Sequence, residues 1–156
     1  MKGIRFAVLG GAGKMGGALI DGLLASGRVE AADIVATARH ERSLLPLRER
    51  GIPTSLDNMA AAAGAAVIVL AVHPDETQGV LQEIRGSLRG DELLISIVTG
   101  ISTAALEKMI ALPLPVVRAN PNIAVVVQQS ATVICRGAHA TDANMALAMD
   151  LFGTVG

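Results

Sequence analysis

Short apolar runs alternate along the chain with segments in which apolar residues recur at helical spacing. The runs are mostly continuous, as in strands that are buried on both faces of a parallel sheet. They cover residues 4–9, 34–38, 66–72, 93–98, 116–117 and 131–135. Several of the segments between them end at a glycine, which is common just past a helix end. The pattern predicts an α/β fold.

This alternation further predicts a mostly parallel sheet with helices on both faces, joined by right-handed crossovers. The chain has 156 residues, the size of one ordinary domain. It contains no internal repeat, low-complexity tract or charge run that would mark a linker. We therefore predict a single Rossmann-type, doubly wound domain over residues 1–156.

Composition excludes several classes of partner. The net charge is −1 and the only aromatic residues are Phe6 and Phe152, so we expect neither a nucleic-acid partner nor a charged membrane surface. No apolar run is long enough to span a bilayer, and residues 1–9 lack the apolar length of a signal peptide. We expect a cytoplasmic protein.

The residues that could bind a metal are few. His40 and His139 have no neighbouring His, Cys or carboxylate at metal-site spacing, and no metal site is predicted. The single cysteine, Cys135, lies in an apolar run. Its expected role is that of a buried, inert thiol.

A glycine-rich segment follows the first predicted strand and opens an amphipathic helix. A bare G-x-G-x-x-G motif is weak, but a strand before it and a second strand near residue 38 complete the unit that binds dinucleotides. In that context Gly11 permits the tight turn, Gly13 lets the backbone approach a pyrophosphate, and Gly16 lets the helix pack closely. The helix N-terminus offers its N–H groups to the phosphates. The predicted phosphate loop is Gly11-Ala12-Gly13-Lys14-Met15-Gly16.

The end of the second strand bears on the choice between NAD(H) and NADP(H). NAD-binding domains carry an Asp or Glu there that accepts from the ribose hydroxyls, but residues 36–38 contain no acid. Instead Thr37 is followed by Arg39 and Arg42, and a guanidinium can hold a 2′-phosphate with two parallel hydrogen bonds. An exposed helix start would also explain these arginines. We favour NADP(H), with NAD(H) the less expected cofactor.

Four segments together resemble the pyrroline-5-carboxylate reductase family. They are the phosphate loop, residues 70–74 (Leu-Ala-Val-His-Pro), residues 96–102 (Ser-Ile-Val-Thr-Gly-Ile-Ser) and residues 117–122 (Val-Arg-Ala-Asn-Pro-Asn). They occur in order and at plausible spacing, and the resemblance covers essentially the whole chain. The combination is much more specific than any one segment.

The resemblance implies an NADPH-dependent oxidoreductase of proline biosynthesis, which transfers hydride to the C=N bond of 1-pyrroline-5-carboxylate, a cyclic imine carboxylate. It also implies that Asn58 contacts the adenosine half of the cofactor. The family places its Ala-Val-x-Pro turn and Pro-Asn loop beside the nicotinamide. The corresponding residues and their neighbours are Ala71, Val72, His73, Pro74, Thr99, Gly100, Asn120, Pro121 and Asn122.

The chain departs from the family on the side that faces the reacting ring. His73 stands where the family usually has Lys, and Asn120 where it usually has Met. His73 could act as an acid or base, or could only pack against the cofactor, because hydride transfer to a protonated imine needs no protein base. We assign no catalytic residue.

Nothing in the chain matches the all-helical second domain of the family, through which its members dimerise and hold the substrate. Half of the active site, and any homo-oligomer, would then depend on a domain outside these residues. Two other functions remain open. One is a related NADP-dependent enzyme, such as a deazaflavin-dependent NADP reductase or an imine or β-hydroxyacid reductase. The other is a non-catalytic nucleotide-binding domain.

Overall fold

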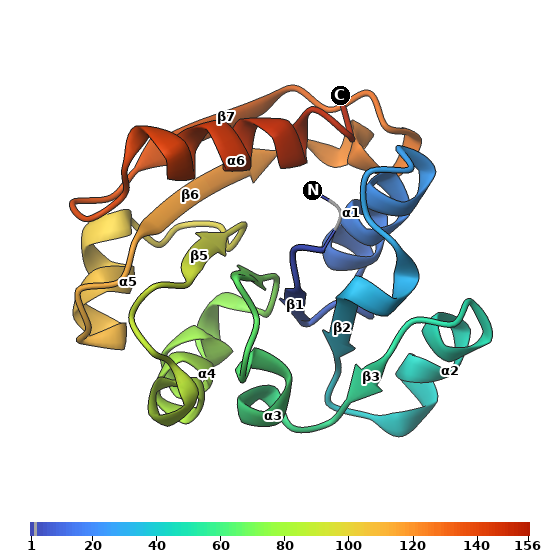
Figure 1. Cartoon of the computed structure of the whole chain (residues 1–156), viewed down its shortest axis with the longest axis horizontal. Coiled ribbons are helices and arrows are strands. Elements are labelled where there is room, and N and C mark those ends of the chain that lie inside the picture. Colours follow the sequence, from blue (N-terminus) through green and yellow to red (C-terminus); the bar gives the residue numbers. More distant parts are fainter. Residues whose placement is uncertain (2) are drawn as a thin grey trace.

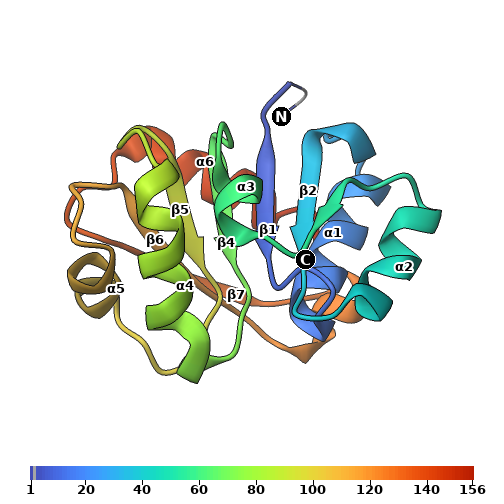
Figure 2. The same cartoon turned by 90° about the horizontal axis from the view of Figure 1, so that it is seen from below.

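Seven strands form one sheet in the computed structural model, which describes residues 1 and 3–156 (Figures 1 and 2). The strands are β1 (Phe6–Leu9), β2 (Ile34–Thr37), β3 (Thr54–Ser55), β4 (Val67–Leu70), β5 (Leu93–Ser96), β6 (Val116–Pro121) and β7 (Thr132–Arg136). The α-helices are α1 (Lys14–Ala25), α2 (Glu41–Glu49), α3 (Asn58–Ala62), α4 (Thr77–Ile84), α5 (Thr103–Ile110) and α6 (Asp142–Phe152). Short 3₁₀ helices are η1 (Ala31–Asp33), η2 (Pro74–Glu76), η3 (Arg85–Ser87) and η4 (Ile123–Val127).

The strand order is β3-β2-β1-β4-β5-β6-β7, and every neighbouring pair except β6–β7 is parallel. This is the doubly wound, mostly parallel sheet that the sequence predicts. The order reverses between β1 and β4, which are paired but far apart along the chain. In open α/β sheets ligands bind at such a reversal, outside the carboxyl ends of the strands.

Several predicted strands are too long at their carboxyl ends. Ala38, Ala71 and Val72 lie beyond β2 and β4, in the loops that follow these strands. Strand β6 is longer than predicted, and β3 was not predicted because only two residues form it. Strand β7 was expected as one more strand of the sheet. The apolar run that predicts it does not show whether it is parallel or antiparallel to its neighbour.

Helices cover both faces of the sheet and create two aliphatic layers. One layer joins the sheet to α1, α2 and α6, and the other joins it to α3, α4 and α5. Figure 1 shows α1 and α6 on one side of the central strands and α3 and α4 on the other. Among the described residues no helix has the length and apolarity needed to cross a membrane.

The expected burial of Cys135 is wrong, because its side chain is exposed. Cys135 belongs to β7, the last strand of the sheet, which α6 covers on one face. Ile134 points to that face and packs against the core, whereas its neighbour Val133 is 65% exposed on the other face. An apolar run on an edge strand therefore does not imply burial on both faces.

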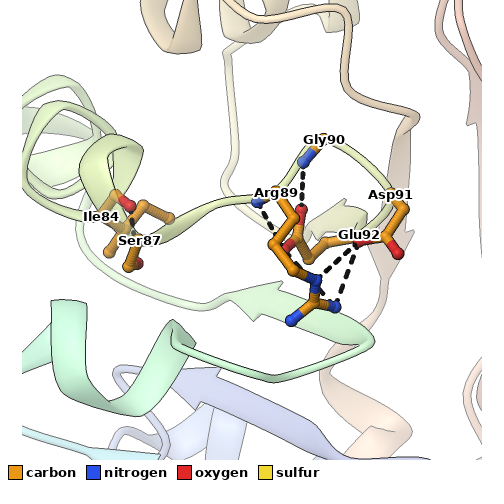
Figure 3. Close-up of polar contacts among 6 residues, drawn as sticks. All are labelled: Ile84, Ser87, Arg89, Gly90, Asp91 and Glu92. Atoms are coloured by element: carbon orange, nitrogen blue, oxygen red, sulfur yellow. Dashed lines mark hydrogen bonds and ion pairs between the residues drawn. The ribbon is translucent and has the colours of Figure 1, made fainter.

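A buried carboxylate orders the turn between α4 and β5 (Figure 3). Glu92 is fully buried, and its two carboxylate oxygens accept from the backbone N–H groups of Arg89 and Gly90, each at 2.9 Å. The Arg89 guanidinium lies 3.7 Å from the same carboxylate. The turn lies at the amino-terminal edge of the sheet, opposite the edge at which ligands bind.

Candidate functional site

The loop after β1 carries glycines for two different reasons. Gly10 has a φ of +81°, and a Cβ there would lie 2.6 Å from the carbonyl oxygen of Ala71. The residue that permits the turn is therefore Gly10, and the prediction that assigned this role to Gly11 is wrong. At Gly11 the constraint is packing, because a Cβ would lie 2.9 Å from that of Ala36.

Gly13 and Gly16 bring helix α1 close to the loop. A Cβ on Gly16 would lie 2.8 Å from the Gly10 carbonyl oxygen, which confirms the predicted close packing. Gly13 is the N-cap of α1 and donates its N–H to the same oxygen at 2.9 Å. No side chain among the described residues caps α1. The N–H groups of its first turn are thus left for an anionic ligand.

Three adjoining hollows form a groove along the carboxyl ends of the strands. The first hollow, of about 360 Å³, lies beside β2, and the second, of about 200 Å³, lies at the loop after β1. They share Ala38, Arg39, Val72 and Glu76. The third, of about 280 Å³, shares Ala71 to His73 with the second and extends to the loop after β5. We call these three hollows the cofactor groove; an extended ligand can occupy all of them.

Most of the predicted site residues line the cofactor groove. They are Ala12, Gly13, Lys14, Met15, Thr37, Arg39, Asn58, Ala71, Val72, His73, Pro74 and Thr99. Gly11 lies within the loop after β1 and Gly16 in the first turn of α1, where the absence of side chains lets the loop and the helix pack closely. The structure does not place the remaining predicted residues at the groove: Arg42, Gly100, Asn120, Pro121 and Asn122.

The Pro-Asn segment lies at the end of β6, separated from β4 by β5. The Asn122 side chain accepts from the N–H of Ala124 at 3.0 Å and caps η4. Its backbone N–H donates to the Ser130 hydroxyl at 3.1 Å. Asn122 therefore has a structural role in this chain, and its expected contact with a cofactor stays a prediction.

A chain of hydrogen bonds fixes the first hollow. The N–H of Gly10 donates to Thr37 Oγ1 at 3.1 Å, and the Thr37 hydroxyl donates to Asn58 Oδ1 at 2.7 Å. The Asn58 amide then donates to Glu83 at 3.0 Å. Thr37 is 1% exposed. This series of hydrogen bonds therefore holds the loop after β1, the end of β2 and the start of α3 together.

Sequence reasoning missed the wall that η2 and α4 contribute to the first hollow. Glu76, Gly79, Val80 and Glu83 line it, and Leu56 adds an apolar side chain. The four residues are spaced three, four and seven apart, which places them on one face of a helix. This spacing is a usable signal, but only once the helix is known to face the carboxyl edge of the sheet.

The charged residues of the groove meet between the first two hollows. Arg39 Nη1 lies 2.7 Å from Glu76 Oε1, with 76% of the Arg39 side chain exposed. The end of β2 carries no carboxylate of its own, as the sequence predicts. The carboxylate that pairs with Arg39 comes instead from η2, which follows β4.

His73 lies where the second and third hollows meet, and it precedes η2 as its N-cap. Its Nδ1 accepts weakly from the Asp75 N–H at 3.4 Å, and its side chain is 66% exposed. No buried partner orients the imidazole among the described residues. The structure therefore gives His73 a local capping role, and its part in chemistry stays a prediction. Within the described part of the chain, no three His, Cys, Asp or Glu residues form a metal-binding group.

The comparisons with known proteins point to nucleotide-dependent reductases. Residues 5–100 match the family model described as NADP oxidoreductase coenzyme F420-dependent. The pyrroline-5-carboxylate reductase of Corynebacterium melassecola is 36% identical over 154 residues, which are 96% of this chain and 56% of the relative. The chain thus spans about half the length of the curated relatives that it matches.

Solved structures agree with this similarity. A pyrroline-5-carboxylate reductase from Coxiella burnetii superposes with a TM-score of 0.93 at 30% identity, over 98% of this chain and 57% of that protein. The pyrroline carboxylate reductase of Plasmodium falciparum, solved with NADP bound, gives 0.86 at 24% identity over 100% and 56%. The second likeness concerns the fold alone.

Proposed function

The chain belongs to the family of NADP oxidoreductases described as coenzyme F420-dependent and is a relative of pyrroline-5-carboxylate reductases. From this premise we propose that it is the cofactor-binding domain of an NADPH-dependent imine reductase. The substrate class is a cyclic imine carboxylate, with reduction of 1-pyrroline-5-carboxylate to proline as the reaction. The named activities of the relatives and the cofactor groove of this chain both support the proposal.

One observation carries the cofactor assignment. At Gly13 the space that a Cβ would enter is bounded only by the Gly10 carbonyl oxygen, at 3.1 Å. The φ of Gly13 is −75°, which any residue can adopt, so the backbone conformation does not demand a glycine, and packing opposes a side chain only through this one tight contact. A diphosphate seated against the N–H groups of α1 would demand one.

The residues of the groove fit the parts of a dinucleotide in order. The first hollow, with Leu56 and Val80 as apolar walls, would hold the adenosine half. Arg39 beside it would hold a 2′-phosphate, and the first turn of α1 the diphosphate. Met15, Ala71 and Val72 would hold the nicotinamide in the third hollow. When bound, the dinucleotide supplies a hydride for the carbon of the C=N bond.

The contribution of this chain to that chemistry is orientation. The groove residues hold one face of the ring toward the substrate, and apolar side chains keep water from it. The matched relatives are nearly twice as long as this chain. We propose that groups outside these residues bind the substrate carboxylate and form any homo-oligomer, and we keep the prediction of a cytoplasmic location.

A second candidate is an NADP reductase that uses a deazaflavin as electron partner. The description of the matching family, which names coenzyme F420, favours it. His73, which lines the third hollow, and Asn120 both depart from the reductase pattern and leave room for a different substrate. The two candidates share the same cofactor groove and differ in what reacts with the nicotinamide.

The cofactor assignment is tested by Gly13→Ala, with Gly17→Ala as the matched control. A methyl group at residue 13 would enter the space of the diphosphate, whereas at residue 17 it would make an ordinary contact of 3.5 Å. We expect Gly13→Ala to weaken NADPH binding about tenfold or more, by displacing it from hydrogen bonds to charged oxygens. Isothermal titration calorimetry measures the affinity and a thermal melt the folding.

The Gly17→Ala variant should bind NADPH as the unchanged chain does and should be at least as stable, because alanine favours a helix interior. The Gly13→Ala variant should stay folded but unfold at a somewhat lower temperature, because its methyl group lies close to the Gly10 carbonyl oxygen. Unaltered NADPH affinity in a folded Gly13→Ala variant would show that no diphosphate lies at this loop. The substrate is tested separately, by following NADPH oxidation with 1-pyrroline-5-carboxylate, other cyclic imines and oxidised coenzyme F420. Oxidation by coenzyme F420 alone would favour the second candidate.

A further inference from the structure

An ion pair spans the cofactor groove where its first and second hollows meet. Arg39 follows β2 and Glu76 ends η2, so the pair connects two loops on either side of the loop after β1. The guanidinium and the carboxylate approach to 2.7 Å, and both residues line both hollows. Any ligand that runs from the first hollow to the second must pass this pair.

The charges around the first hollow oppose the binding of an anionic ligand there. Of the described residues that line it, Arg39 is the one cation, while Glu76 and Glu83 are carboxylates. Glu83 is held by the Asn58 amide at 3.0 Å, and Glu76 by Arg39. A phosphate that binds Arg39 therefore competes with Glu76 for one guanidinium and meets a negative charge at close range.

The Arg39–Glu76 ion pair is weak enough for a ligand to break it. Three quarters of the Arg39 side chain is exposed, and an exposed ion pair is weak because solvent and salt screen it. A phosphate carries more charge than a carboxylate and can accept two parallel hydrogen bonds from an arginine. A phosphate can thus displace Glu76 from Arg39. Breaking the ion pair costs binding free energy, and a ligand without that phosphate does not have this cost.

We infer that Glu76 is a specificity-determining residue that reduces the preference of this domain for NADPH over NADH. The inference rests on the proposed function, because it concerns the adenosine half of that cofactor. Glu76 competes with the 2′-phosphate of NADPH for Arg39. Toward NADH, which has a hydroxyl at the same place, the Glu76 carboxylate is an acceptor. Glu76 thereby supplies, from the turn after β4, a carboxylate of the kind that the end of β2 lacks.

The test is Glu76→Gln in the 156-residue chain, with Asp75→Asn as the control. Both changes remove one negative charge from η2, but Asp75 is 90% exposed and does not line the first two hollows. We expect Glu76→Gln to tighten NADPH binding about three- to tenfold, the size of effect that a close, partly exposed charge pair has on an affinity. NADH binding should be unchanged or weaker, so the ratio of the two affinities rises.

Calorimetry with NADPH and with NADH on all three proteins separates the outcomes. The inference is supported if the ratio of NADPH affinity to NADH affinity rises in Glu76→Gln and not in Asp75→Asn. A thermal melt checks that the affinities have not changed because a variant is less stable. Equal ratios in Glu76→Gln and the unchanged chain would overturn it while leaving the proposed function intact. An equal rise in Asp75→Asn would overturn it too, as a general charge effect. If no variant binds either dinucleotide, the proposed function fails and the inference with it.

Discussion

At the scale of single residues, Thr37 shows how a buried hydroxyl organises the groove. It accepts from the Gly10 N–H and donates to Asn58, at the point where the loop after β1 meets the end of β2. The sequence singles out Thr37 only as a neighbour of Arg39. Its role depends on two segments, 27 and 21 residues away, that the fold brings beside it.

Replacement of Thr37 by Val should therefore damage both stability and binding. Valine has nearly the same shape but leaves the Gly10 N–H without its acceptor, and an unpaired buried donor costs about 1–3 kcal/mol of unfolding free energy. NADPH affinity should fall as well, because the loop that holds the diphosphate loses its anchor. Thr37→Ser, which keeps the hydroxyl, is the control, and urea unfolding with calorimetry measures both effects. Equal loss in the two variants would assign the effect to packing rather than to the hydroxyl.

The other site residues differ in whether the sequence around them was enough to predict their role. Gly13 and Arg39 could be predicted because a strand, its loop and a helix are read from neighbouring residues, and Ala71 because it belongs to a motif of the family that the chain resembles. Glu76 and Glu83 could not be predicted, because their part in the site depends on how η2 and α4 face the groove. The contact of the Asn122 backbone N–H with Ser130 was also hidden, since Ser130 belongs to the next loop.

At the scale of elements, hydrophobic patterning predicts the buried strands and says less about the edges of the sheet. Strands β1, β4 and β5 are buried throughout, and their continuous apolar runs give their positions within about two residues. The edge strands β3 and β7 are harder. Strand β3 is too short for a pattern, and the exposed Cys135 shows that one face of β7 is open.

The turn before β5 gives a test of stability that should leave the groove untouched. Glu92→Ala removes the acceptor of two backbone N–H groups, and hydrogen bonds to a charged group contribute about 1.5–3 kcal/mol. We expect a loss of roughly 2–3 kcal/mol in urea unfolding with NADPH affinity unchanged, because the turn lies at the opposite edge of the sheet. Asp91→Ala, at an exposed neighbour, should change stability little. A Glu92→Ala variant as stable as the unchanged chain would show that this carboxylate is not an anchor.

At the scale of the whole molecule, the groove combines signals that are weak alone. A glycine-rich loop predicts only that a dinucleotide could bind there. The strand reversal beside it, the missing acid on β2 and the guanidinium of Arg39 together favour a 2′-phosphorylated cofactor. The relatives add the reaction, and because the chain spans about half of their length, the reaction is the part of the account that most depends on residues outside it.

The most direct test of the central claim is the affinity of the 156-residue chain for NADPH and NADH, measured by calorimetry on the unchanged protein and on Arg39→Ala. The account predicts that NADPH binds about tenfold or more tightly than NADH, since an arginine–phosphate contact is worth a strong charged hydrogen bond. Arg39→Ala should remove most of that preference by weakening NADPH alone. Equal or tighter binding of NADH by the unchanged chain, or a preference that survives in Arg39→Ala, would contradict it.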